Sequence, residues 1–103
     1  MDQALVQKLI AEECDAVKDL LIRKNQDYGN SFADPIMIFS QSDAMEQLAV
    51  RIDDKLKRIK NRSQKNDPGE DTTTDLIGYL VLLKVLTRLK NETPYTVMEW
   101  PNV

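Results

Sequence analysis

The last third of the chain carries apolar side chains around most of the circumference of one predicted helix. They do not keep to a single stripe: Leu76, Ile77, Leu80, Val81, Leu82, Leu83, Val85 and Leu86. A helix that is apolar on every side is usually buried on every side. A chain of 103 residues has little other structure with which to surround it. We therefore expect this helix to lie at the centre of a bundle that a second copy of the chain completes.

Two earlier segments have apolar residues at three- and four-residue spacing, which is the pattern of an amphipathic helix. The first helix is expected from Asp2 to about Lys24, and its apolar stripe is Val6, Leu9, Ile10, Val17, Leu20 and Leu21. The second is expected to begin near Asp43, because Asp43 and Glu46 have the spacing of a capping box. Its apolar stripe is Met45, Leu48, Ala49, Ile52, Leu56 and Ile59.

The third helix has the clearest predicted start. Asp67 suits an N-cap, Pro68 suits the first helical position, and Glu70 completes a capping box. We expect the helix to run from there to about Lys90.

The segments between and after the helices contain residues that break regular structure. A loop is expected from Asn25 to about Gln41, and an irregular tail over residues 91–103. The chain shows no internal repeat and no convincing strand. The fold class predicted is all-α: a single domain, 1–103, forming a small helical bundle of three main helices per chain, completed by oligomerisation into a dimer or a larger assembly.

The residue types exclude several kinds of chemistry. The chain has no histidine and one cysteine, Cys14, which excludes Ser-His-Asp and Cys-His catalysis and zinc sites built on these residues. Acidic residues outnumber Lys plus Arg by 17 to 14, so no general nucleic-acid binding is expected. No apolar run reaches the roughly 18–20 residues of a membrane span, and the first residues do not resemble a signal peptide. The expected location is the cytoplasm.

Carboxylates are the candidate chemical groups that remain. Asp71 and Asp75 are four residues apart, so they are neighbours on the third helix, at the head of a face that continues as apolar core. Carboxylates directed inward are costly unless a cation compensates them, and a bridging divalent ion would do so. The alternative is that both are solvated in the first turns of the helix, where its positive end favours them.

Two other charged positions also allow two interpretations. Glu13 lies on the apolar stripe of the first helix, where it is either paired with a Lys or Arg or serves as a ligand. The second helix carries four charged residues that the pattern places away from its apolar stripe: Arg51, Asp54, Lys55 and Arg58. They form either a solvated charged face or a mixed site, with a carboxylate for metal and cations for phosphate oxygens.

The first loop opens with a turn sequence, and Gly29 or Asn30 is expected at positive φ. A turn does not need a tyrosine, so Tyr28 either stacks on a base or packs on the bundle.

Three segments, taken in order, resemble the nucleotide-modification-associated domain of phages and bacteria. They are 24–32 (KNQDYGNSF), 51–61 (RIDDKLKRIKN) and 70–79 (EDTTTDLIGY). That family looks related to the all-α nucleoside triphosphate pyrophosphohydrolases, the MazG-like and dimeric dUTPase-like enzymes. The resemblance covers about Leu20 to Leu86. If the protein is phage-encoded, the expected location is the host cytoplasm.

The resemblance implies a role for residues at the matching positions. In MazG-like enzymes, acids on two consecutive helices bind Mg²⁺, or Mn²⁺, for cleavage of a triphosphate to a monophosphate and pyrophosphate. The matching catalytic and metal-binding acids are Asp54, Asp71 and Asp75, with Glu70 as a further metal ligand. The matching nucleotide-binding residues are Lys24, Asp27, Tyr28, Asn30, Arg51, Lys55, Arg58 and Tyr79.

One departure from the family pattern separates two hypotheses. MazG-like enzymes have a Glu-rich motif on the earlier helix, whereas residues 46–50 here (EQLAV) contain one acid, Glu46. The leading hypothesis is a Mg²⁺-dependent nucleotide pyrophosphohydrolase, for which Asp75→Asn should abolish turnover and leave folding nearly intact. The alternative is a helical oligomer that binds or sequesters a nucleotide without cleaving it, and a third interpretation is a plain oligomerisation module.

Overall fold

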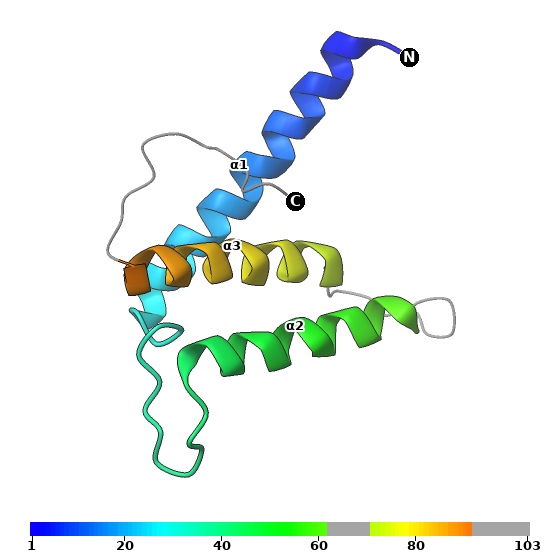
Figure 1. Ribbon diagram of the computed structural model, residues 1–103. Helices are drawn as coiled ribbons and strands as arrows, with labels where there is room; N and C mark the ends of the chain where they lie inside the picture. The colour runs from blue at the N-terminus through cyan, green and yellow to red at the C-terminus, as the bar shows by residue number, and fades with distance from the viewer. Residues whose placement is uncertain (62–70, 92–103) are drawn as a thin grey trace.

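The computed structural model describes residues 1–61 and 71–91, and these form three α-helices and no strand (Figure 1). α1 spans Gln3–Tyr28, α2 spans Ala44–Lys60 and α3 spans Thr72–Asn91. The predicted all-α class is confirmed. Within the described ranges, no helix is both long and apolar enough to cross a membrane. The irregular tail expected from residue 91 lies, from residue 92 onward, outside the described residues.

α1 is longer than the sequence pattern suggested, because the predicted loop residues 25–28 continue the helix. Asp2 caps its start, with Oδ1 accepting a 3.0 Å hydrogen bond from the Ala4 N–H. Gly29 ends the helix at φ +68° and donates its N–H to the Asn25 carbonyl oxygen at 2.7 Å. The Asn25 side chain donates to the Gly29 carbonyl oxygen at 3.1 Å and to Asn30 Oδ1 at 2.9 Å. The positive φ predicted for Gly29 or Asn30 thus falls on Gly29, the residue without a Cβ.

The start of α2 was predicted correctly, but the start of α3 was not. Asp43 caps α2, with Oδ1 accepting from the Glu46 N–H at 2.9 Å. α3 begins at Thr72, where Asp71 Oδ1 accepts from the Thr74 N–H at 3.0 Å. An Asp whose side chain accepts from the third residue of a helix is a typical N-cap. The proposed cap Asp67, with Pro68 and Glu70, lies outside the described residues.

α3 lies between the other two helices. α2 packs along it, and α1 crosses it obliquely, so that the N-terminal half of α1 extends beyond the α2–α3 pair (Figure 1). The main core lies between α2 and α3 and consists of Ala44, Leu48 and Leu86, with Leu48 only 1% exposed. Partly buried side chains surround it: Phe32, Ala33, Met45, Tyr79, Leu82 and Leu83. The loop after α1 therefore closes one end of the α2–α3 core.

The contact between α1 and α3 depends on a glycine. A Cβ added at Gly78 would lie 3.2 Å from Leu21 Cδ2 of α1, so the absence of a side chain lets the two helices approach closely. Gly78 is buried, and Val17, one turn earlier than Leu21 on α1, is also buried.

The expected all-round burial of α3 is not met by one chain. Five of its apolar residues are more than a third exposed: Leu89 near the end of the helix, and Ile77, Leu80, Val81 and Val85, which share one face. α1 and α2 cover the other sides of the helix, and too little described chain remains to cover this one. That a second copy covers it stays a prediction, since a single chain does not test it.

Candidate functional site

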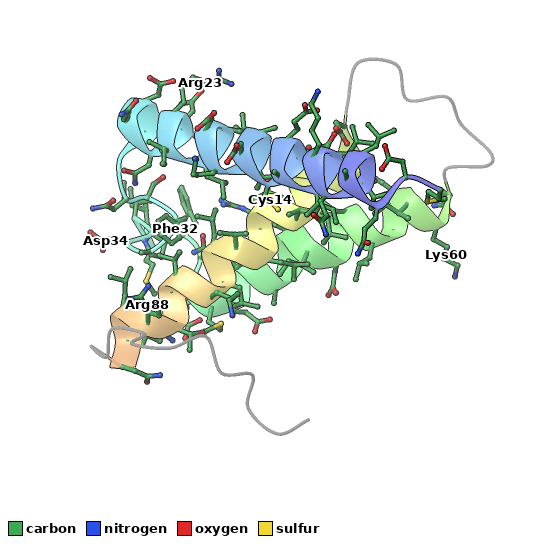
Figure 2. The ribbon with its side chains drawn as sticks, turned by 90° about the horizontal axis from the view of Figure 1, so that it is seen from above. Cys14, Arg23, Phe32, Asp34, Lys60 and Arg88 are labelled. Atoms are coloured by element: carbon green, nitrogen blue, oxygen red, sulfur yellow. The ribbon has the colours of Figure 1, made fainter. Side chains whose placement is uncertain are left out.

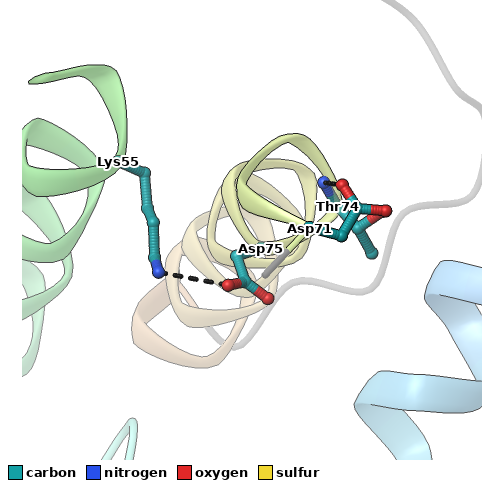
Figure 3. A network of polar contacts seen from close by, with 4 residues as sticks. All are labelled: Lys55, Asp71, Thr74 and Asp75. Atoms are coloured by element: carbon teal, nitrogen blue, oxygen red, sulfur yellow. Dashed lines mark hydrogen bonds and ion pairs between the residues drawn. The ribbon is translucent and has the colours of Figure 1, made fainter. Parts of the chain in front are cut away.

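An ion pair between α2 and α3 is the central polar feature of the described chain. Lys55 Nζ lies 3.1 Å from Asp75 Oδ2, and the two side chains are 11% and 27% exposed (Figure 3). Lys55 is the one buried charged residue in the described ranges, and it joins α2 to α3 through a partner 20 positions later in the sequence. A pair this sheltered from water fixes the geometry of both side chains more firmly than a surface pair does.

The position of Lys55 corrects the sequence interpretation. Lys55 was expected on a charged face away from the apolar stripe of α2, yet it is buried, whereas Leu56 is 49% exposed. Leu48, Ile52 and Lys55 follow each other at four- and three-residue spacing, so Lys55 belongs to the face that packs on α3. Its aliphatic stem fits an apolar interface while the ammonium reaches a carboxylate.

Asp71 and Asp75 have different environments although they are four residues apart. Asp71 is exposed and caps α3, and its Oδ2 also accepts from the Thr74 hydroxyl. Figure 3 shows Asp71 and Thr74 on the side of α3 away from α2, whereas Asp75 faces Lys55. Asp71 therefore matches the alternative of a solvated residue at the helix N-terminus, and Asp75 matches the expectation of an inward carboxylate that has found a cation.

The described residues do not by themselves form a metal site. No three Asp, Glu, Cys or His side chains in residues 1–61 and 71–91 gather closely enough to hold a metal ion. Asp54 is exposed on α2, and Glu70 lies outside the described residues. A Mg²⁺ site usually needs several oxygen ligands, and the described part of one chain does not gather Asp54, Asp71 and Asp75 into such a set. The ion implied by the family resemblance stays a prediction.

Positive charge follows one side of α2. Arg51 and Arg58 are exposed and lie about one turn before and one turn after Lys55, so the three share one side of the helix. We call Arg51, Lys55 and Arg58 the cationic strip. Lys55, the middle residue of the strip, contacts the N-terminal half of α3, where its Nζ lies 3.1 Å from Asp75 Oδ2. Asp54, three residues after Arg51 and four before Arg58, is exposed on the same side of α2. Together with Asp75 it offsets part of the charge of the strip, so three cations stand beside two carboxylates in a chain whose net charge is −3.

The remaining candidates do not join this strip in one chain. Lys24, Asp27, Tyr28 and Asn30 are all exposed around the C-terminal end of α1. Figure 2 shows Arg23, near that end, and Lys60, at the end of α2, at opposite ends of the molecule.

Two tyrosine candidates have opposite environments. Tyr28 is 75% exposed and does not pack on the bundle in this chain. Tyr79 packs against the α2–α3 core, which gives it a structural place rather than a position on the cationic strip.

The sequence pattern did not reveal two exposed apolar surfaces. The loop between α1 and α2 exposes four consecutive apolar residues, Ile36, Met37, Ile38 and Phe39, and Phe39 is 98% exposed. The sequence signal that could have revealed this surface is the unbroken apolar run inside the segment predicted to be a loop. The other surface is the uncovered N-terminal half of α1, whose stripe was taken to be core.

Comparison of the chain with protein-family models, with curated proteins and with solved structures gave no match. The likeness to the nucleotide-modification-associated domain thus rests on the three motifs of the sequence.

Proposed function

We propose that this protein binds the phosphate groups of a nucleotide along the cationic strip of α2, beside the N-terminal half of α3. The observation that supports this most is the placement of Lys55. Its ammonium is held at one position between α2 and α3, with exposed guanidinium groups one turn away on each side. Arg is well suited to phosphate, because its planar fork donates two parallel hydrogen bonds to phosphate oxygens.

We place nucleotide binding ahead of nucleotide hydrolysis because the carboxylates that hydrolysis would need already have other roles. Asp75 already has a cation in Lys55, and Asp71 caps α3. Neither is left as one of several open ligands around a metal ion, which two-metal phosphoryl chemistry requires. This favours the non-catalytic nucleotide binder, which the sequence analysis placed second.

Hydrolysis remains the second candidate, and one feature favours it. Asp75 accepts from Lys55 through Oδ2, and its Oδ1 has no hydrogen bond to any described residue (Figure 3). A carboxylate with one fixed and one open oxygen is able to accept a proton from water or to contact a cation. In the pyrophosphohydrolase hypothesis the substrate is a nucleoside triphosphate, the cofactor is Mg²⁺ or Mn²⁺, and Asp75 is the acid whose loss should abolish turnover.

A calorimetric titration tests the proposed binding. Ribo- and deoxyribonucleoside mono-, di- and triphosphates are titrated into the protein with and without EDTA. We expect binding that survives chelation and weakens by about tenfold or more when Arg51 and Arg58 are both replaced by alanine. Lys57→Ala is the matched control, because Lys57 is also an exposed cation of α2 but lies away from the cationic strip. Equal affinities in the control and the double variant would contradict the proposed site.

A pyrophosphate-release assay on the same panel separates the two candidates. Turnover that needs Mg²⁺ or Mn²⁺ and disappears in Asp75→Asn would establish the enzyme. Nucleotide binding without turnover under any of these conditions would show that the protein is a non-catalytic nucleotide binder.

We also propose that the protein functions as an assembly of identical chains. The support is the exposed apolar face of α3, which a helix of this composition does not normally leave in water.

A further inference from the structure

The apolar stripe of α1 is covered over only part of its length. Near its C-terminal end, Val17 is buried and Leu21 packs on Gly78 of α3. In the N-terminal half, three large apolar residues are about half exposed: Leu5 at 51%, Leu9 at 49% and Ile10 at 58%. Figure 1 shows this half of α1 beyond the α2–α3 pair. An amphipathic helix whose stripe continues past its own partner indicates a second partner.

α3 presents a second uncovered apolar surface. Ile77, Leu80, Val81 and Val85 are between 38% and 44% exposed, and their spacing places them on one face of the helix. We call these four residues the α3 patch. The core residue Leu86 lies on the side that α2 covers. The α3 patch and the open half of α1 are both helical surfaces a few turns long.

The two surfaces carry opposite charges. Between Asp2 and Ala16, the sequence contains four acidic residues and one basic residue, Lys8. Glu12 lies 4.0 Å from that Lys8, and Asp15 lies 3.3 Å from Lys18, but Glu13, on the apolar stripe, has no ion pair with any described residue.

Every charge that follows Asp75 in α3 is positive: Lys84, Arg88 and Lys90. Lys84 lies three residues after Val81, on the face that carries the α3 patch. The open half of α1 is thus apolar with an acid on its stripe, and the α3 face is apolar with a base beside it.

We propose that these two surfaces bind each other between two copies of the chain. The N-terminal half of α1 from one copy lies on the α3 patch of the other, and the contact repeats in the opposite sense about a two-fold axis. Glu13 of each copy then faces Lys84 of the other. Two such contacts bury large apolar side chains from both copies, on the scale of the roughly 800 Å² per partner of a standard interface. The inference rests on the assembly of identical chains proposed above and is independent of nucleotide binding.

Charge exchange between copies tests this arrangement. By sedimentation equilibrium, the unaltered protein should be a dimer at micromolar concentration. Glu13→Lys and Lys84→Glu should each weaken dimerisation by about tenfold or more, because each places like charges together twice in the dimer. Glu12→Lys is the matched control, since it makes the same change of charge one residue away from the stripe, and it should dimerise more tightly than Glu13→Lys. Circular dichroism checks that helix content is unchanged in every variant.

Mixing the two single variants gives the decisive result. In a heterodimer of the Glu13→Lys and Lys84→Glu variants, both contacts again join opposite charges, so the mixture should form dimers nearly as well as the unaltered protein. The double variant should do the same alone. A monomeric unaltered protein at about 50 µM, above the micromolar range of a standard interface, would overturn the proposal. A mixture that associates no better than its two components would overturn it as well.

Discussion

Removing either partner of the Lys55–Asp75 pair should destabilise the protein, and the two effects should be coupled. The perturbations are Lys55→Met, which keeps the length of the side chain and removes its charge, and Asp75→Asn, which keeps shape and hydrogen-bonding groups. Lys55→Met leaves a carboxylate that is only 27% exposed without its cation. Asp75→Asn removes the Asp75 carboxylate from contact with an ammonium that is 11% exposed.

The expected magnitude lies between two known limits. Breaking a fully buried pair costs about 3–5 kcal/mol, whereas an exposed pair contributes about 0.2–1 kcal/mol. Because Lys55 is well buried and Asp75 only partly so, each single change should lower the free energy of unfolding by about 2 kcal/mol. The double variant should lose about 1–1.5 kcal/mol less than the sum, since the two substitutions remove the two ends of one contact.

Urea unfolding followed by circular dichroism measures these values, at one fixed protein concentration because a dimer makes stability depend on concentration. With a slope of about 1–1.5 kcal/mol per molar urea, each single variant should unfold at a midpoint lower by about 1.5 M. Lys57→Met, at an exposed position of the same helix, should stay within about 0.5 kcal/mol. Additive effects of the two substitutions would contradict the proposed coupling between Lys55 and Asp75. Losses of unfolding free energy no larger than in Lys57→Met would contradict the stabilising role of the buried pair.

Substitutions at three further positions test local features of the fold. Gly29→Ala should lower the free energy of unfolding by about 1–3 kcal/mol, because φ +68° and ψ −151° suit only glycine. The cost comes from the backbone alone, since no atom lies within 4 Å of an added Cβ. Urea unfolding measures the loss, and an unchanged stability would contradict the assigned helix end. Gly78→Leu should separate α1 from α3 and cost about 1–3 kcal/mol by overpacking against Leu21, with faster amide exchange around Val17. In Gly78→Ala, the roughly 1 kcal/mol gain in helix propensity should offset the tight contact. Asp43→Ala should cost about 1 kcal/mol through loss of the α2 cap, and unchanged thermal stability would contradict that role.

The local signals of the sequence were reliable where a single residue determines the conformation. Asp43 caps α2 as its spacing with Glu46 predicted, and Gly29 takes the positive φ expected of the turn. These features depend on short-range geometry, namely a side-chain oxygen near a free N–H or a residue without a Cβ. The start of α3 shows the limit of such signals, since Asp67 and Asp71 both suit a cap, and the described structure uses Asp71.

Tertiary context decided the features that the pattern could not. The pattern placed Lys55 away from the apolar stripe of α2, in either a solvated charged face or a mixed site. Lysine is rarely buried without a partner, and the approach of Asp75 from another helix makes its burial favourable. The same contact changes the expectation for Asp75→Asn. The sequence suggested a divalent ion as the compensating cation and nearly intact folding after this substitution. Because Lys55 is the cation beside Asp75, the substitution should affect stability as well as any activity.

The candidate nucleotide site was only partly foreseeable. The motif around Arg51, Lys55 and Arg58 was recognised, and the structure places it beside Asp75. The separation of the Tyr28 region from this strip depends on how α1 crosses α3, which Gly78 and Leu21 determine and no local pattern reveals.

The most direct test of the proposed nucleotide site is an NMR titration of the labelled protein with a non-hydrolysable nucleoside triphosphate in the presence of EDTA. Phosphate binding at the cationic strip should shift backbone and side-chain signals together along residues 51–58 of α2 and around Asp75 on α3, and Lys57→Ala should leave these shifts in place. Saturation with no shift in these two segments, or shifts confined to other surfaces, would contradict a phosphate site at the cationic strip.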